Sequence, residues 1–285
     1  MSPARPRAIL PPERVTIVGV LNATPDSFSD GGRFVSGQAC VDRDAAVDAA
    51  AALLAGGAHV LDVGGESTRP GARTVPAELE ADRVVPVIEA VARRFDAAIW
   101  VDTRKSGVAR AALAAGACAV NDVSGLRFDA ELAGVVAAAA AALVLGHLRG
   151  SPETMQEAER FDDVVTEVAD ELATSVAAAR EAGIPDERLA VDPGLGFGKD
   201  WRESLALLAQ VDALRARLGL PVLVGPSRKS FLGRVTGDAV AERDVATFAA
   251  CAVAAFLGAD GLRVHDAAGA ARAVAVGRAL REARL

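Results

Sequence analysis

The stretch Val15-Thr-Ile-Val-Gly-Val-Leu21 leads directly into Asn22-Ala-Thr-Pro-Asp-Ser-Phe-Ser-Asp-Gly-Gly32. The first part is an almost continuous apolar run and predicts a buried strand. The second part is a polar loop with several hydroxyls, two carboxylates, one aromatic ring and a Gly pair. Polar loops carried by rigid strands often hold binding and catalytic groups, although an ordinary polar connection is the alternative. The amide of Asn22, at the end of the strand, is suited to a hard metal ion or an anion.

The same strand-and-helix unit recurs along the whole chain. Expected strands cover residues 15–21, 59–64, 98–102, 119–123, 143–147, 189–192, 222–225 and 261–265. Expected helices lie near residues 39–56, 77–94, 105–116, 130–141, 162–182, 201–218, 241–258 and 267–283. Apolar strands joined by helices indicate a parallel sheet. Eight such units in about 250 residues predict an α/β fold, a (β/α)₈ or TIM barrel with its site at the C-terminal face.

We predict a single barrel domain over residues 15–285, preceded by a short N-terminal extension, 1–14. The alternative, an open doubly wound sheet, more often carries a Gly-rich phosphate loop after its first strand. The segment Gly194-Leu-Gly-Phe-Gly-Lys199 is only superficially similar to a P-loop. Pro193 stands where the first Gly is required, and Asp200 stands where Ser or Thr is required.

Composition narrows the class of partner. The 285 residues carry a net charge of −7, with a sequence pI of about 5.1. This acidic balance argues against a nucleic-acid or anionic-membrane surface, while a local basic pocket for a small anion stays possible. The cysteines Cys40, Cys118 and Cys251 are widely spaced, and the N-terminus lacks the apolar core of a signal peptide. Both features indicate a cytoplasmic protein with reduced thiols.

Polar side chains occur at the ends of the expected strands. They are Asn22, Asp62 with Glu66, Asp102, Asn121 with Asp122, His147, Asp192, Ser227 with Lys229, and Arg263 with His265. A single Asp at such a place is usually a helix N-cap, and Asp122 and Asp266 have that alternative. In a barrel, however, all these ends gather on one face.

Two kinds of chemistry separate within this set. Arg69, Arg263 and His265 suit an anion such as a diphosphate, because guanidinium groups bind phosphate oxygens in pairs. The alternative is salt bridging across the barrel mouth. Asp102, Asn121 and Asp192, with Lys229, suit the N–H and carbonyl edge of a guanine or pterin ring.

At this point the chain is identified by resemblance as a member of the dihydropteroate synthase family of pterin-binding enzymes. The matching segments are Asn22–Gly32, Asp62-Val-Gly-Gly-Glu-Ser-Thr-Arg-Pro-Gly71, Val101–Thr103, Asn121-Asp122, Asp192–Lys199, Ser227-Arg-Lys-Ser230 and Arg263-Val-His-Asp266. They run in the family's order over roughly residues 15–275. The first two segments together are highly specific, whereas pterin-dependent methyltransferases share the Asp and Asn elements.

The resemblance implies a transferase of folate biosynthesis. Such an enzyme condenses 6-hydroxymethyl-7,8-dihydropterin diphosphate with p-aminobenzoate, releases pyrophosphate along an SN1-like path, uses Mg²⁺ and forms a homodimer. By position, the resemblance implies that the pterin ring binds to Asp102, Asn121, Asp192 and Lys229. It implies that the diphosphate binds to Asn22, Arg69, Arg263 and His265, with Asn22 near the metal. It implies further that p-aminobenzoate contacts Phe28, Thr68, Pro70 and Ser227, and that the catalytic residues are Asp30, Asp102 and Lys229. Its partners are then small molecules.

Two alternatives remain beside this interpretation: a pterin-dependent methyltransferase-type protein, and a pterin-binding paralogue without turnover. Both diphosphate-handling loops and the residues Asp30, Arg69 and Lys229 are present, which favours the synthase. The chain departs from the family at Gly146 and Pro226, where Met is common, and at Trp100, where a small residue is usual. We expect Trp100 to point into the barrel and to fill volume released by Gly146.

Overall fold

The computed structural model describes residues 8–24, 42–69, 71–151, 153–155 and 160–284. Within these residues, eight parallel strands form one sheet: β1 (Thr16–Asn22), β2 (Val60–Gly64), β3 (Ala98–Asp102), β4 (Ala119–Asp122), β5 (Ala142–Gly146), β6 (Leu189–Asp192), β7 (Leu223–Val224) and β8 (Gly261–Val264). The strand order is β6-β5-β4-β3-β2-β1-β8-β7. A parallel bridge between Val191 and Val222 joins the two outer strands of that order, so the predicted barrel is confirmed.

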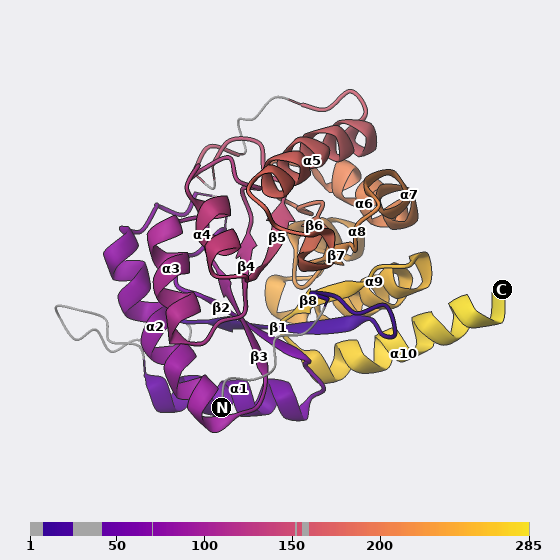
Figure 1. Cartoon of the computed structure of the whole chain (residues 1–285). Coiled ribbons are helices and arrows are strands. Elements are labelled where there is room, and N and C mark those ends of the chain that lie inside the picture. Colours follow the sequence, from indigo (N-terminus) through magenta and orange to yellow (C-terminus); the bar gives the residue numbers. More distant parts are fainter. Residues whose placement is uncertain (1–7, 25–41, 70, 152, 156–159, 285) are drawn as a thin grey trace.

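Helices surround the sheet, as Figure 1 shows. They are α1 (Arg43–Ala55), α2 (Ala77–Arg94), α3 (Ser106–Ala115), α4 (Leu132–Ala138), α5 (Val164–Glu181), α6 (Trp201–Ala209), α7 (Val211–Leu218), α8 (Ser230–Thr236), α9 (Asp244–Leu257) and α10 (Ala267–Arg284). The short 3₁₀ turns Asp186–Arg188 and Val240–Glu242 precede β6 and α9. No helix in the described ranges is both long and apolar enough to cross a membrane.

Two helix predictions were wrong. The helix expected over 201–218 is broken at Gln210, whose φ of −120° and ψ of 32° leave the helical region. Helix α8 was not predicted, because it is only seven residues long and contains Gly233. A Cβ atom at Gly233 would lie 2.4 Å from Nε of Arg243.

Alternation along the strands separates two environments. Residues such as Leu61, Val101 and Leu143 face the helices and belong to the main hydrophobic core. Residues of the opposite parity point inward, where one apolar cluster contains Val18, Val60, Trp100, Ala119, Val144, Ala190 and Leu223. Further along the same strands, inward positions change to Asp62, Asp102, Asn121, Asp192 and Arg263. The barrel therefore has an apolar lower layer and a polar layer at the C-terminal end.

The segment before β1 contributes to the lower layer. Ile9 and Leu10 are buried and pack in the cluster that contains Trp100. The N–H of Ile9 donates to the carbonyl oxygen of Glu187 at 3.0 Å. Part of the predicted N-terminal extension thus packs against the barrel interior.

Candidate active site

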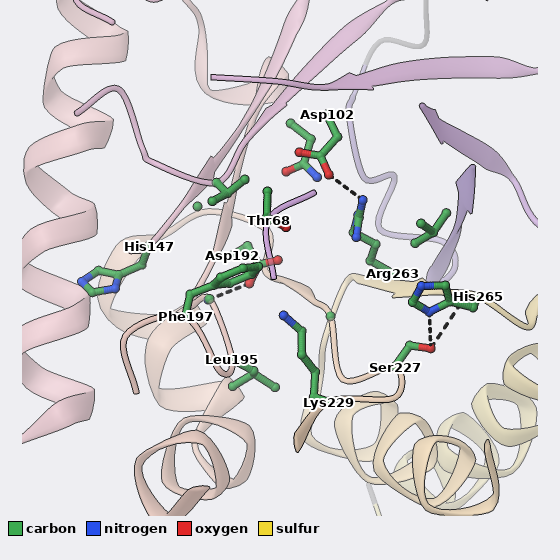
Figure 2. Close-up of a pocket in the computed structure, with 16 residues that line it drawn as sticks. Thr68, Asp102, His147, Asp192, Leu195, Phe197, Ser227, Lys229, Arg263 and His265 are labelled. Carbon is green, nitrogen blue, oxygen red and sulfur yellow. Dashed lines mark hydrogen bonds and ion pairs between the residues drawn. The ribbon is translucent and has the colours of Figure 1, made fainter. Parts of the chain in front are cut away.

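One cavity opens where the strands end, and most of the predicted site residues line it (Figure 2). Its lining contains Val20, Thr68, Asp102, Asn121, Val123, Gly146, His147, Asp192, Gly194, Leu195, Phe197, Gly225, Ser227, Lys229, Arg263 and His265. Asn22 and Arg69 are described but do not belong to this lining. Phe28, Asp30 and Pro70 lie outside the described residues.

Arg263 lies between two buried carboxylates. Its Nε donates to Oδ2 of Asp62 at 2.6 Å, and its Nη2 donates to Oδ2 of Asp102 at 2.7 Å. Both acids are at most 9% exposed. Charge-assisted bonds of this kind fix geometry strongly in a site with little water. The guanidinium predicted for the diphosphate is therefore also part of the wall predicted for the pterin ring.

Asp62 is a residue to which sequence reasoning gave no role. Besides binding Arg263, its Oδ2 accepts from Nδ2 of Asn121 at 2.9 Å and so fixes the orientation of that amide. The available signal was its parity, because Asp62 interrupts the apolar run of β2 at an inward position.

Three buried carboxylate oxygens lack a hydrogen-bond partner among the described residues: Oε1 of Glu80 on α2, and, on the inward side of the strands, Oδ1 of Asp62 and Oδ1 of Asp102. Buried polar atoms are nearly always hydrogen-bonded, so an unmet acceptor indicates a ligand or water. Asp102 lines the cavity, and burial raises the pKa of its carboxyl against the opposing effect of Arg263. A ring N–H is the kind of group that would satisfy its oxygen.

Asp192 and Lys229 face each other across the same cavity (Figure 2). Burial raises the pKa of Asp192, whose Oδ1 accepts from the N–H of Gly194 at 2.7 Å. Burial lowers the pKa of Lys229 to about 8, opposed by the charge of Asp192. The Lys229 ammonium lies 3.6 Å from the centroid of the Phe197 ring, a cation–π contact that keeps it directed into the cavity.

Arg228, which precedes Lys229 in sequence, holds the loop that carries Lys229. Arg228 has a φ of +57°, which is rare for a residue with a side chain. Its guanidinium forms two bonds to Asp244, at 2.8 and 2.9 Å, and its N–H donates to Thr247 at 3.0 Å. These contacts to α9 stabilise the turn that presents Ser227 and Lys229 to the cavity.

His265 pairs with Ser227. The backbone N–H of His265 donates to Oγ of Ser227 at 3.2 Å, and Oγ lies 2.9 Å from Nδ1 of the ring. Burial lowers the pKa of His265 to about 4, so its ring is neutral at pH 7. A serine hydroxyl that donates to Nδ1 places the ring hydrogen on Nε2. In this state the Nε2–H group is a neutral donor.

His147 is 1% exposed and has a partner at each ring nitrogen. Nδ1 lies 2.8 Å from Nζ of Lys199, and Nε2 lies 3.0 Å from Oε2 of Glu171. These two partners make His147 a satisfied core histidine, although the residue also borders the cavity. Burial lowers the pKa of Lys199 to about 7, and its ammonium also donates to the carbonyl oxygens of His147 and Phe197. Lys199 thus holds the β6–α6 loop.

Trp100 points into the barrel as expected and is 1% exposed. The proposed exchange of volume with Gly146 was wrong. A Cβ atom at Gly146 would lie 2.6 Å from Cα of Val123 and 2.8 Å from the carbonyl oxygen of Asp122. Backbone of the neighbouring strand β4 and its extension therefore occupies the space at Gly146.

Metal ligation was predicted only at Asn22, which is half-buried at the end of β1. Within the described parts of the chain, no three His, Cys, Asp or Glu side chains are grouped to hold a metal ion. A single amide oxygen from Asn22 fits the usual binding mode of Mg²⁺, in which one or two protein oxygens are joined by substrate phosphates and water.

The chain is similar to known proteins over most of its length. The family described as "Pterin binding enzyme" matches residues 18–265. A dihydropteroate synthase from Synechocystis is 43% identical over 269 residues, which cover 94% of this chain and 91% of that protein. The Xanthomonas albilineans dihydropteroate synthase solved with 4-aminobenzoic acid is 43% identical, with a TM-score of 0.85 and 94% coverage of both chains. The same enzyme solved with 7,8-dihydropteroate gives 40% identity, a TM-score of 0.83 and 95% coverage of both chains.

Proposed function

The chain belongs to the pterin-binding enzyme family and has the activity of a dihydropteroate synthase, a transferase of folate biosynthesis; from that premise we propose how its residues carry out the reaction. The substrates are 6-hydroxymethyl-7,8-dihydropterin diphosphate and p-aminobenzoate, and the products are 7,8-dihydropteroate and pyrophosphate. One observation carries the assignment to this site: a wall of acids and an amide meets three basic side chains in one cavity at the strand ends.

The pterin ring is proposed to bind against Asp102, Asn121, Asp192 and Lys229. The unmet Oδ1 atom of Asp102 supports this placement, because a ring N–H would complete its hydrogen bonding. Asp192 and Lys229, which also line the cavity, offer an acceptor and a donor. This arrangement matches a ring with alternating N–H and carbonyl groups better than it matches a purely anionic ligand.

The diphosphate is proposed to bind near Asn22, Arg69, Arg263 and His265. Arg263 supplies a cation, and His265 supplies a neutral Nε2–H donor held by Ser227. We also propose Mg²⁺ as a cofactor, with Asn22 as its protein oxygen ligand. When bound, this ion neutralises charge on the departing pyrophosphate.

The bond changes follow from these placements. The C–O bond between the pterin methylene and the diphosphate breaks, and its electron pair leaves with pyrophosphate. The dihydropterin ring stabilises the positive methylene, so an SN1-like path is favoured, with Asp102, Asp192 and Asp30 as nearby negative charges. The amine nitrogen of p-aminobenzoate forms the new C–N bond, and its proton passes to the departing pyrophosphate. Phe28, Thr68, Pro70 and Ser227 are the proposed contacts of p-aminobenzoate.

We propose further that the protein is a cytoplasmic homodimer. Exposed apolar side chains on two neighbouring helices support an interface, with Val245 and Val253 on α9 and Val276 and Leu280 on α10. The Cys251 thiol is buried, and burial raises its pKa to about 12, which is typical of an unreactive reduced cysteine. Sedimentation velocity of the purified protein tests the dimer.

Complementation tests the activity in a cell. A bacterial strain that lacks its own dihydropteroate synthase and needs added folate end products should grow without them when it expresses this chain. A variant with Lys229→Ala and an unchanged unfolding midpoint should not restore growth. Growth with the Lys229→Ala variant, or failure of the folded wild-type chain, would contradict the proposed function.

A further inference from the structure

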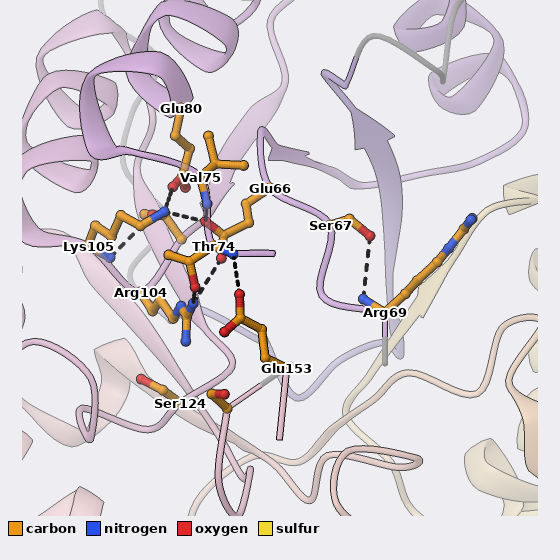
Figure 3. Close-up of polar contacts among 12 residues, drawn as sticks. Glu66, Ser67, Arg69, Thr74, Val75, Glu80, Arg104, Lys105, Ser124 and Glu153 are labelled. Atoms are coloured by element: carbon orange, nitrogen blue, oxygen red, sulfur yellow. Dashed lines mark hydrogen bonds and ion pairs between the residues drawn. The ribbon is translucent and has the colours of Figure 1, made fainter. Parts of the chain in front are cut away.

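A buried charge cluster beside the cavity holds the loop that follows β2. It consists of Glu66 in that loop, Glu80 on α2, and Arg104 and Lys105 after β3, and Figure 3 shows these side chains converging. The four side chains are between 1% and 8% exposed. We name these four residues the loop clasp.

Glu66 closes its own loop. Its Oε2 accepts from the N–H of Val75 at 2.9 Å, nine residues further along the chain. Its Oε1 accepts at 3.0 Å from Nη2 of Arg104, and that nitrogen also donates at 3.0 Å to Oγ1 of Thr74. One carboxylate and one guanidinium therefore hold both ends of segment 66–75.

Lys105 connects Glu66 to helix α2. Its Nζ donates to Oε2 of Glu66 and to Oε2 of Glu80 on α2. Burial raises the pKa of Glu80, while the bond from Lys105 lowers it. Two acids and two bases make the clasp neutral overall. Removing either acid would thus leave an uncompensated positive charge out of water, which is costly for a buried pair.

The start of the loop is also pressed against α2. Nη1 of Arg83 donates to the carbonyl oxygen of Gly65 at 2.9 Å. A Cβ atom at Gly65 would lie 2.8 Å from Val84, so no larger residue fits there. On the far side, the Arg104 guanidinium lies 4.0 Å from the centroid of the Phe128 ring. The clasp is thus enclosed on several sides.

The position of the clasp links two parts of the candidate site. Segment 66–75 carries Thr68, which lines the cavity, and Arg69, which lies next to it in sequence. Arg104 and Lys105 follow Asp102 by two and three residues, and Asp102 belongs to the proposed pterin wall. The residues that hold Glu66 therefore directly follow Asp102, the carboxylate proposed to bind the pterin ring.

We propose that Glu66, held by Arg104 and Lys105, positions the loop after β2 relative to Asp102. Thr68 and Arg69 on this loop then meet the second substrate and the diphosphate while the pterin ring is held. Glu80 stabilises Lys105 from α2 and has no part in this positioning role. Glu66 is the central positioning residue, because it alone contacts both the loop end and both cations of the clasp. The proposal rests on the proposed function of the site. The residues of the clasp are not part of the cavity lining.

Two matched variants separate positioning from stability. Glu66→Gln and Glu80→Gln each remove one buried charge next to Lys105, so both should lower the unfolding midpoint. Of these two acids, only Glu66 lies in the loop, and it accepts from the N–H of Val75 at the other end of that loop. The Gln side chain in Glu66→Gln has only one acceptor oxygen, because an NH₂ group replaces the second carboxylate oxygen. This NH₂ group must face either the N–H of Val75 or one of the two cations, and none of these can accept a hydrogen bond from it. The loop should loosen in this variant, whereas Glu80→Gln leaves the contacts of Glu66 with Val75 and Arg104 in place.

Steady-state kinetics gives the deciding result. Glu66→Gln should raise the KM for p-aminobenzoate roughly 10-fold, as expected when reacting groups are slightly misplaced. Its dissociation constant for a dihydropterin without diphosphate, measured by calorimetry, should stay at the wild-type value. Glu80→Gln should change neither quantity.

Equal KM changes in both variants, or none in Glu66→Gln while the wild type turns over, would overturn the positioning role. Absence of turnover in the folded wild type would instead contradict the function itself, so the two failures are distinguishable.

Discussion

The Nη2 atom of Arg263 lies 2.7 Å from Oδ2 of Asp102, which joins a proposed diphosphate ligand to a proposed pterin ligand. The same guanidinium binds Asp62 at 2.6 Å. The binding regions proposed for the pterin ring and for its diphosphate are therefore not independent. Loss of the diphosphate would leave Arg263 held by the acids, and arrival of the ring would act on the same ion pairs.

Removal of Arg263 should weaken both parts of substrate binding. In Arg263→Gln, Asp62 and Asp102 lose their shared cation, and breaking a buried pair costs about 3–5 kcal/mol of folding free energy at the upper end of such effects. Calorimetry should show weaker binding of pyrophosphate and also of a dihydropterin without diphosphate. His265→Gln is the control and should weaken pyrophosphate binding alone. Wild-type affinity for the dihydropterin in Arg263→Gln would contradict the coupling.

The dependence of activity on pH should have an alkaline limb set by Lys229. Burial lowers the pKa of Lys229 to about 8, so the amine loses its proton, and its ability to donate from a charged group, as pH rises through that value. Burial raises the pKa of Asp102, so the acid limb lies above the ordinary range of Asp, and activity falls there as pH decreases. The profile of kcat/KM for the pterin diphosphate reports these free-enzyme groups.

Lys229→Arg is the matched variant for this profile, because arginine stays charged over the whole range. Its alkaline limb should disappear while the acid limb remains. An alkaline limb that is unchanged in Lys229→Arg would assign the limb to another group.

Loss of the Ser227 hydroxyl should act through His265. In Ser227→Ala the Nδ1 atom loses its donor, so the tautomer that offers Nε2–H is no longer favoured. We expect a loss of about 1 kcal/mol in pyrophosphate affinity, the usual net value of one hydrogen bond. The double variant Ser227→Ala/His265→Gln should bind pyrophosphate no more weakly than His265→Gln. Additive losses in the double variant would show that Ser227 acts independently of His265.

Trp100 should matter for stability rather than for substrate binding. It is among the largest fully buried side chains and lies in the apolar lower layer with Val18, Val60 and Val144. Trp100→Ala should cost about 3–5 kcal/mol of unfolding free energy, measured by urea titration. Trp201, at the half-buried start of α6, is the control and should cost clearly less. A similar loss at both positions would contradict the layered barrel interior.

The sequence predicted the strands well because each is a short apolar run bounded by a polar residue or Gly. Strand β3 was placed at its observed bounds, and the parity of Trp100 and Asp102 was correct. The break at Gln210 and the short helix α8 escaped prediction, because the backbone leaves the helical region at a single residue and α8 is only seven residues long with a glycine inside it.

The site could be predicted in part. Asp102, Asn121, Asp192, Lys229, Arg263 and His265 do gather at one cavity, since strand ends in a barrel share a face. Salt bridging of Arg263 at the barrel mouth was the stated alternative, and the structure shows such pairs. The role of Asp62 and the particular acids that pair with Arg263 were not predictable, because they depend on which side chains meet across the barrel, up to 201 residues apart in sequence. The neutral state of His265 likewise follows from burial, which a single sequence does not display.

The most direct test of the central claim is the release of pyrophosphate from 6-hydroxymethyl-7,8-dihydropterin diphosphate by the purified chain with Mg²⁺. Release should depend on p-aminobenzoate and should match the 7,8-dihydropteroate formed, one for one. Asp192→Ala, with wild-type folding, should abolish it, and a chelator should suppress it. Folded wild-type protein that releases no pyrophosphate, or releases it without forming dihydropteroate, would contradict the account.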